Sequence, residues 1–157
     1  MDLSKRYRLC TWVAGTASLG MGAFHLALPH VFGWGPYVDT LPPAIHWGVY
    51  SINCFFSVLL ILGALLSLRT RIDSGDAATL VPFGMSVFWA INAAYQIVIP
   101  FPMPRSMQAV RWSLLAFPIV VGVCYGAAYV AAKRRASRGE LRRTLTLPLR
   151  GTTRCRS

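Results

Sequence analysis

The sequence is poor in charged residues, and above all in acidic ones. Only 13% of its 157 residues are charged and five of these are Asp or Glu, whereas 55% of the chain is hydrophobic. This composition excludes a soluble Rossmann-type enzyme and a disordered basic protein, because both need far more polar surface. It indicates an integral membrane protein.

Motifs of the common enzyme classes are also absent. The sequence contains no P-loop, no H-E-x-x-H, no Ser-His-Asp set and no paired carboxylates inside an apolar run. None of its four cysteines (Cys10, Cys54, Cys124 and Cys155) forms a C-x-x-C motif or falls in a predicted external loop. A secreted disulfide scaffold and a zinc knuckle are therefore excluded, and an enzyme acting on its own is not expected.

Long uncharged apolar runs are what the chain does contain. A helix needs about 20 residues to cross a hydrocarbon core of about 30 Å. Four runs reach this length, at about residues 9–28, 44–68, 77–99 and 112–132. They lack the alternation of a barrel strand. The sequence therefore predicts an all-α polytopic membrane protein, with an antiparallel bundle of four transmembrane helices in residues 1–132.

Prolines and capping residues mark the ends of these runs. Pro29 is expected to stop the first helix, and Asp73, Ser74 and Asp76 offer caps before the third. Further prolines precede the second helix (Pro42 and Pro43) and follow the third (Pro100, Pro102 and Pro104).

Basic residues are distributed unequally between the ends of the runs. With the N-terminus inside, only Arg105 and Arg111 of the sixteen Lys and Arg residues lie outside, and the other fourteen are cytoplasmic. The positive-inside rule then predicts a multi-pass protein of the bacterial inner membrane with both termini cytoplasmic. The basic tail, residues 133–157, is expected to be partly disordered and to anchor the topology. Contact with anionic lipid is the main alternative role, and a nucleic acid partner is not expected.

Polar residues, interspersed with glycine on the first run, recur at helical spacing on three of the runs. They are Thr11, Gly15, Ser18, Gly22 and His25 on the first; His46, Tyr50, Asn53 and Ser57 on the second; and Ser86, Trp89, Asn92 and Gln96 on the third. In lipid such side chains turn toward the bundle interior or a wet cavity. Because neighbouring helices run antiparallel, the sequence predicts one polar pocket that opens outward beneath the loop with Trp34, Tyr37 and Asp39. Its predicted lining is His25, His46, Tyr50, Asn53, Asn92 and Gln96.

Three interpretations of these residues stay open. The carboxamides could simply bond across the bundle while the aromatic residues form an interfacial belt. The pocket could hold a quinone, with an imidazole or a Tyr hydroxyl on its carbonyl. Alternatively, His25 and His46 could ligate haem iron, or His30 and Asp39 could complete a zinc or copper site.

Small residues provide two packing surfaces. Gly122 and Gly126 form a G-x-x-x-G motif on the fourth run, and Ala14, Ser18 and Gly22 form a ridge on the first. Both allow close approach of another helix, either within the chain or in a homodimer.

One stretch resembles a known family. Gly22-Ala23-Phe24-His25-Leu26-Ala27-Leu28-Pro29, followed by a loop, a second apolar run and Gly63-Ala64-Leu65-Leu66, resembles the first two helices of the DoxX/DoxD-like small membrane proteins. The resemblance implies a four-helix bacterial inner-membrane protein tied to quinone-linked redox chemistry through a partner subunit, and it points at His25. That group is expected to have an acidic residue in its second helix. This sequence has none there, and Asn53 is the nearest polar residue.

Three functional classes follow from these features. The first is an accessory or redox-associated membrane subunit with a pocket for a quinone-like ligand. The second is a non-catalytic assembly or scaffold protein that binds a membrane protein partner. The third, a small-molecule transporter, is disfavoured because no apolar run contains an acidic residue for proton coupling.

Overall fold

The described part of the chain is mostly helical. The computed structural model describes residues 2–100 and 105–146, and no strand occurs among them. The elements are α1 (Leu3–Val31), α2 (Gly35–Val38), α3 (Pro43–Arg69), α4 (Ala77–Val98), the 3-10 helix η1 (Arg105–Met107) and α5 (Gln108–Thr146). The predicted all-α class is confirmed.

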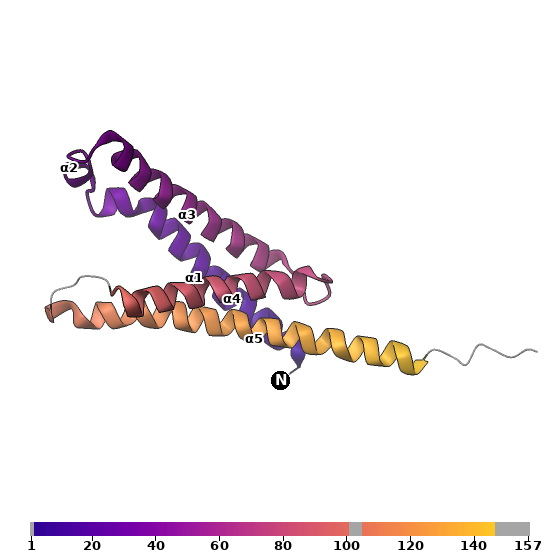
Figure 1. Ribbon diagram of the computed structural model, residues 1–157. Helices are drawn as coiled ribbons and strands as arrows, with labels where there is room; N and C mark the ends of the chain where they lie inside the picture. Colours follow the sequence, from indigo (N-terminus) through magenta and orange to yellow (C-terminus); the bar gives the residue numbers. More distant parts are fainter. Residues whose placement is uncertain (1, 101–104, 147–157) are drawn as a thin grey trace, which may run out of the picture.

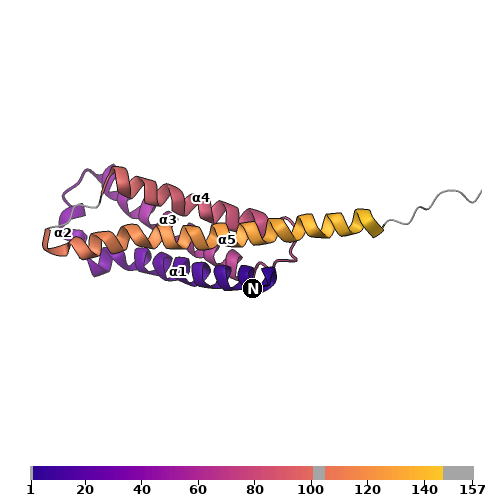
Figure 2. The same cartoon turned by 90° about the horizontal axis from the view of Figure 1, so that it is seen from below.

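The four long helices form two antiparallel hairpins (Figure 1). α1 packs along α3, α4 packs along α5, and the hairpins meet where α1 crosses α5, whereas α3 and α4 touch little. Figure 1 shows the hairpins diverging toward the end that carries α2, although all four helices run along one common axis in Figure 2. The core is built from all four long helices, with Ala14 of α1, Leu60 of α3, Trp89 of α4 and Tyr125 of α5 packed together, whereas the hairpins have separate surfaces at the α2 end.

Among the described residues, three helical segments are long and apolar enough to cross a membrane. They are Pro43–Arg69, Ala77–Val98 and Arg105–Glu140, a segment that includes η1. α1, which contains the first of the four predicted spans, is not among them. Its buried face consists largely of small and polar residues, including Thr11, Gly15 and Ser18, which lowers its apolar content. The chain thus has the long apolar helices expected of a membrane protein.

Several helix ends differ from the prediction. α1 continues through Pro29 to Val31, and α5 runs to Thr146, so the first part of the predicted tail is helical. Asp76 is the N-cap of α4, but its side chain makes no capping hydrogen bond. The predicted helix-ending residues Pro102 and Pro104 and the rest of the tail, residues 147–157, lie outside the described residues.

Glycines set the close approach within each hairpin. A Cβ added to Gly22 would lie 2.8 Å from a side-chain carbon of Ile61 and 3.2 Å from the backbone oxygen of Ser57, both on α3. On α5, a Cβ added to Gly122 would lie 3.3 Å from the Cβ of Trp89 on α4. The small residues predicted for close packing therefore pack inside the chain.

Candidate functional site

An open hollow lies between the C-terminal end of α1, α2 and the first half of α3. Its volume is about 450 Å³. Seven residues line it: Leu26, Pro29, His30, Gly35, Tyr50, Asn53 and Cys54. Tyr50 and Asn53 belong to the predicted pocket, and His30 belongs to the predicted metal residues. We call this cavity the α1–α3 hollow.

A short polar chain stands beside the α1–α3 hollow. The carboxylate of Asp39 lies 3.1 Å from Nε2 of His46, and the His46 ring centroid lies 5.1 Å from that of Tyr50. The ring of Trp34 lies on Tyr50 as well, at 6.3 Å between centroids. These contacts follow from local structure, because His46 and Tyr50 are one turn apart on α3. The Asp39 carboxylate thus contacts one nitrogen of the His46 ring and links the α2 loop to α3.

Asn53 contacts the backbone of His25 through a hydrogen bond. The side-chain amide of Asn53 donates a hydrogen bond of 2.9 Å to the His25 carbonyl oxygen. Pro29 lies four residues later in α1 and has no N–H to give that carbonyl, so the Asn53 amide supplies the missing donor. The His25 ring instead packs against Phe56, with 4.9 Å between centroids. Asn53 thus has a clear structural role in joining α3 to α1.

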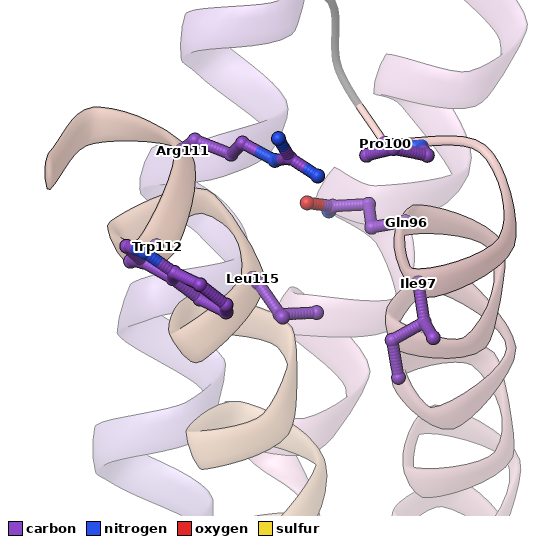
Figure 3. A pocket seen from close by; sticks show the side chains of 6 residues that line it. All are labelled: Gln96, Ile97, Pro100, Arg111, Trp112 and Leu115. Atoms are coloured by element: carbon purple, nitrogen blue, oxygen red, sulfur yellow. The ribbon is translucent and has the colours of Figure 1, made fainter. Parts of the chain in front are cut away.

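The remaining two predicted residues lie elsewhere, on α4. Gln96 donates a 2.8 Å hydrogen bond to the Asn92 side-chain oxygen one turn before it. Gln96 also lines a second hollow of about 170 Å³ between the end of α4 and the start of α5, which we call the α4–α5 hollow (Figure 3). The six predicted residues are therefore divided between two hairpins, because α3 and α4 barely touch.

The predicted metal residues do not assemble into one group. His46 pairs with Asp39, His30 lines the α1–α3 hollow, and His25 packs on Phe56. Within residues 2–100 and 105–146, no three or more His, Cys, Asp or Glu side chains lie where together they could hold a metal ion. The described residues therefore do not gather the ligands that a zinc or copper site of three or more side chains would need.

A buried polar cluster joins three helices at the centre of the molecule. Ser18 of α1 accepts hydrogen bonds from Trp89 Nε1 of α4 at 3.1 Å and from the Tyr125 hydroxyl of α5 at 3.4 Å. All three side chains are almost completely buried. The polar stripes predicted Ser18 and Trp89 to face inward, and the structure confirms this. Tyr125 was not singled out, because the few hydroxyl residues of the fourth run, Ser113, Tyr125 and Tyr129, do not form a long polar stripe.

Comparisons with protein-family models, with curated proteins and with solved structures find no match to this chain.

Proposed function

We propose that the chain is a small multi-pass protein of the bacterial inner membrane, with α1 as a fourth span and both termini cytoplasmic. The antiparallel order supports this topology, because it gathers the start of α1, the loop after α3 and the basic part of α5 at one end of the bundle. Arg105 and Arg111 lie at the opposite end, so the charge bias agrees with the positive-inside rule.

Labelling of single cysteines in whole cells tests this topology. In a chain whose native cysteines are replaced by serine, Tyr37→Cys should react with a membrane-impermeant maleimide, and Ser74→Cys should react only after the cells are opened. The opposite pattern, or equal labelling at both positions, would show that the proposed orientation is wrong.

Within this membrane, we propose that the protein is an accessory, redox-associated subunit that holds a quinone-like ligand in the α1–α3 hollow. One observation carries the proposal: the Asp39–His46–Tyr50 chain stands at the edge of a cavity of about 450 Å³. Pockets for small organic ligands commonly measure about 300–1,000 Å³ and combine apolar walls with a few polar groups. The resemblance to the DoxX/DoxD-like group agrees with this proposal.

Residues in the hollow and beside it have distinct parts in such a pocket. Leu26 and Pro29 offer apolar walls for a quinone ring. The Tyr50 hydroxyl can donate a hydrogen bond to a quinone carbonyl, and His46, held by Asp39, can accept a proton released by a quinol. Electrons would pass to or from a partner subunit.

Quinone content and quinone titration test this proposal. Protein purified in mild detergent from its own membrane should yield quinone on solvent extraction, and added short-chain quinone should quench tryptophan fluorescence to saturation. Tyr50→Phe should weaken the affinity about 5- to 10-fold, the equivalent of one hydrogen bond of about 1 kcal/mol. Tyr95→Phe, on the exposed face of α4, is the matched control and should leave the affinity unchanged. An empty extract together with a linear, non-saturating titration would refute the quinone pocket.

A non-catalytic assembly or scaffold role is the second candidate. It is favoured by the position of α3, which packs on α1 almost alone and leaves Ile52, Phe55 and Leu59 exposed. A helix of a partner protein, or of a second copy of this chain, could pack on that face. Gentle solubilisation should then recover a stoichiometric complex, and Phe55→Ala should dissociate it. Recovery of this chain by itself, as a monomer, would count against the role.

A further inference from the structure

The α4–α5 hollow is distinct from the proposed quinone pocket and has a different chemical character. Figure 3 shows the Arg111 guanidinium of α5 reaching across the mouth of the hollow toward the Gln96 carboxamide of α4. Pro100 closes one side, and the side chains of Ile97, Trp112 and Leu115 complete the lining. One cation and one carboxamide thus converge over an otherwise apolar cavity.

The positive charge of Arg111 has no counterion among the residues that the structure describes. Within residues 2–100 and 105–146, no carboxylate lies within ion-pair distance of its guanidinium, although the side chain is half-buried. Asp39 is the acidic residue of the loop at this end of the bundle, and it pairs with His46. A half-buried cation without a counterion is unfavourable, so binding of an anion at this point would lower the free energy of the protein.

Gln96 is held in place as a second donor. Its side-chain nitrogen gives one hydrogen to Asn92 in a 2.8 Å bond, which fixes the carboxamide on the surface of α4. The other hydrogen on that nitrogen has no partner among the described residues and can donate to an anion. Together with the forked guanidinium, it offers the several donors that phosphate oxygens accept.

The surroundings select an amphiphile over a free ion. Ile97 is 64% exposed and Trp112 is 59% exposed, on either side of the hollow. Arg111 directly precedes the apolar part of α5, so the guanidinium lies at the level where a lipid headgroup meets the acyl chains. A cavity of about 170 Å³ is too small for most organic ligands but accommodates a phosphate group.

We propose that the α4–α5 hollow is a binding site for the phosphate of an anionic phospholipid, with Arg111 and Gln96 as its donors and the acyl chains lying along Ile97 and Trp112. This proposal does not depend on the quinone pocket, because the two sites share no residue.

Native mass spectrometry of the full chain tests the proposal. The probe is phosphatidylglycerol added to delipidated protein in mild detergent, and diacylglycerol with the same acyl chains shows whether the phosphate is needed. We expect one tightly retained phosphatidylglycerol and no retained diacylglycerol. Arg111→Gln should weaken phosphatidylglycerol retention about tenfold or more, because it removes a charge-assisted contact.

Matched variants separate a site from general charge attraction. Arg105→Gln removes the same charge six residues away, outside the hollow, and should leave retention unchanged. Gln96→Leu should weaken retention about two- to fivefold, and Arg111→Lys should fall between Arg111→Gln and the wild type because it keeps the charge but loses the fork. These two variants decide the question if Arg111→Gln fails to fold.

Two results would overturn the proposal. Equal losses from Arg105→Gln and Arg111→Gln, or no loss from either, would show that no specific site exists at Arg111. Displacement of the lipid by millimolar inorganic phosphate would assign the hollow to a free anion instead of a lipid headgroup.

Discussion

Replacing Ser18 with alanine should destabilise the protein through the two buried donors that its hydroxyl serves. Trp89 Nε1 lies 3.1 Å from Ser18 Oγ and the Tyr125 hydroxyl lies 3.4 Å from it, so the first bond is the stronger. All three groups are shielded from solvent, and Ser18→Ala would leave both donors without that partner. Loss of a buried partner costs about 1–3 kcal/mol in soluble proteins, whereas hydrogen bonds between membrane helices average about 0.6 and reach about 1.7 kcal/mol. We therefore expect a loss of about 1–2 kcal/mol in the free energy of unfolding.

A double-mutant cycle in mixed micelles measures this value. The unfolding free energy is determined for the wild type, Ser18→Ala, Trp89→Phe and the double variant, and the coupling energy should be about 1 kcal/mol. Thr16→Ala on the exposed face of α1 is the control and should change stability by less than about 0.5 kcal/mol. If Ser18→Ala matches that control, or if the coupling energy is zero, the cluster does not hold the three helices together.

Three further predictions concern helix packing and pH. Asn53→Leu should cost about 1–2 kcal/mol, and much less in a Pro29→Ala background, where the backbone again supplies its own donor to the carbonyl of His25; equal costs in both backgrounds would refute this. Gly22→Ala should destabilise by about 1–3 kcal/mol, because its Cβ would crowd α3, whereas Gly20→Ala meets nothing within 4 Å and should stabilise by up to about 1 kcal/mol; thermal unfolding compares the two. Burial raises the pKa of Tyr7, which precedes the first predicted span, from 10.0 to about 12. The unfolded chain therefore loses this proton first, and stability should fall as pH rises from 10 to 12. Tyr7→Phe should abolish that fall and also raise stability at pH 7, because the buried hydroxyl has no hydrogen-bond partner among the described residues; an unchanged pH profile would contradict this.

Helical periodicity predicted the inward face of α1 correctly. Thr11, Gly15, Ser18 and Gly22 are all buried, as their spacing of three and four residues requires in a helix. The reason is local: the repeat of a helix fixes which side chains share a face, whatever that face later meets. The same reasoning found Trp89 on α4. It could not find Tyr125 or Arg111, because each depends on a neighbour that only the tertiary arrangement supplies.

The sequence did not show which helices pack against each other. Polar stripes on the second and third predicted spans suggested that Asn53 and Asn92 converge. In the structure α3 belongs to one hairpin and α4 to the other, so Asn53 bonds to the backbone of α1 and Asn92 to Gln96 of its own helix. A carboxamide can pair with any hydrogen-bond donor or acceptor within reach. Its presence in a membrane span therefore indicates that it needs a partner, but does not identify that partner.

A contact between helices also explains why α1 does not stop at Pro29 as predicted. Proline ends a helix when the carbonyl that it deprives of a donor is left unsatisfied. Here the Asn53 amide satisfies that carbonyl from the neighbouring helix, and α1 continues to Val31. The residues after Pro29 then reach the α2 loop as a helical extension, which brings His30 to the edge of the α1–α3 hollow. A structural hydrogen bond on α3 thus helps to shape the candidate site.

Separation of the hairpins at the α2 end also determines how the two candidate sites relate. The α1–α3 hollow is built from one hairpin and the α4–α5 hollow from the other, and the helices between them, α3 and α4, make few contacts. Substitutions without shared partners act additively. Tyr50→Phe should therefore weaken quinone affinity equally in the wild type and in Arg111→Gln, and lipid retention should not respond to Tyr50→Phe. Non-additive effects would mean that the two hollows are coupled through the contacts between the hairpins, such as the rings of Phe56 on α3 and Phe88 on α4, whose centroids lie 5.7 Å apart.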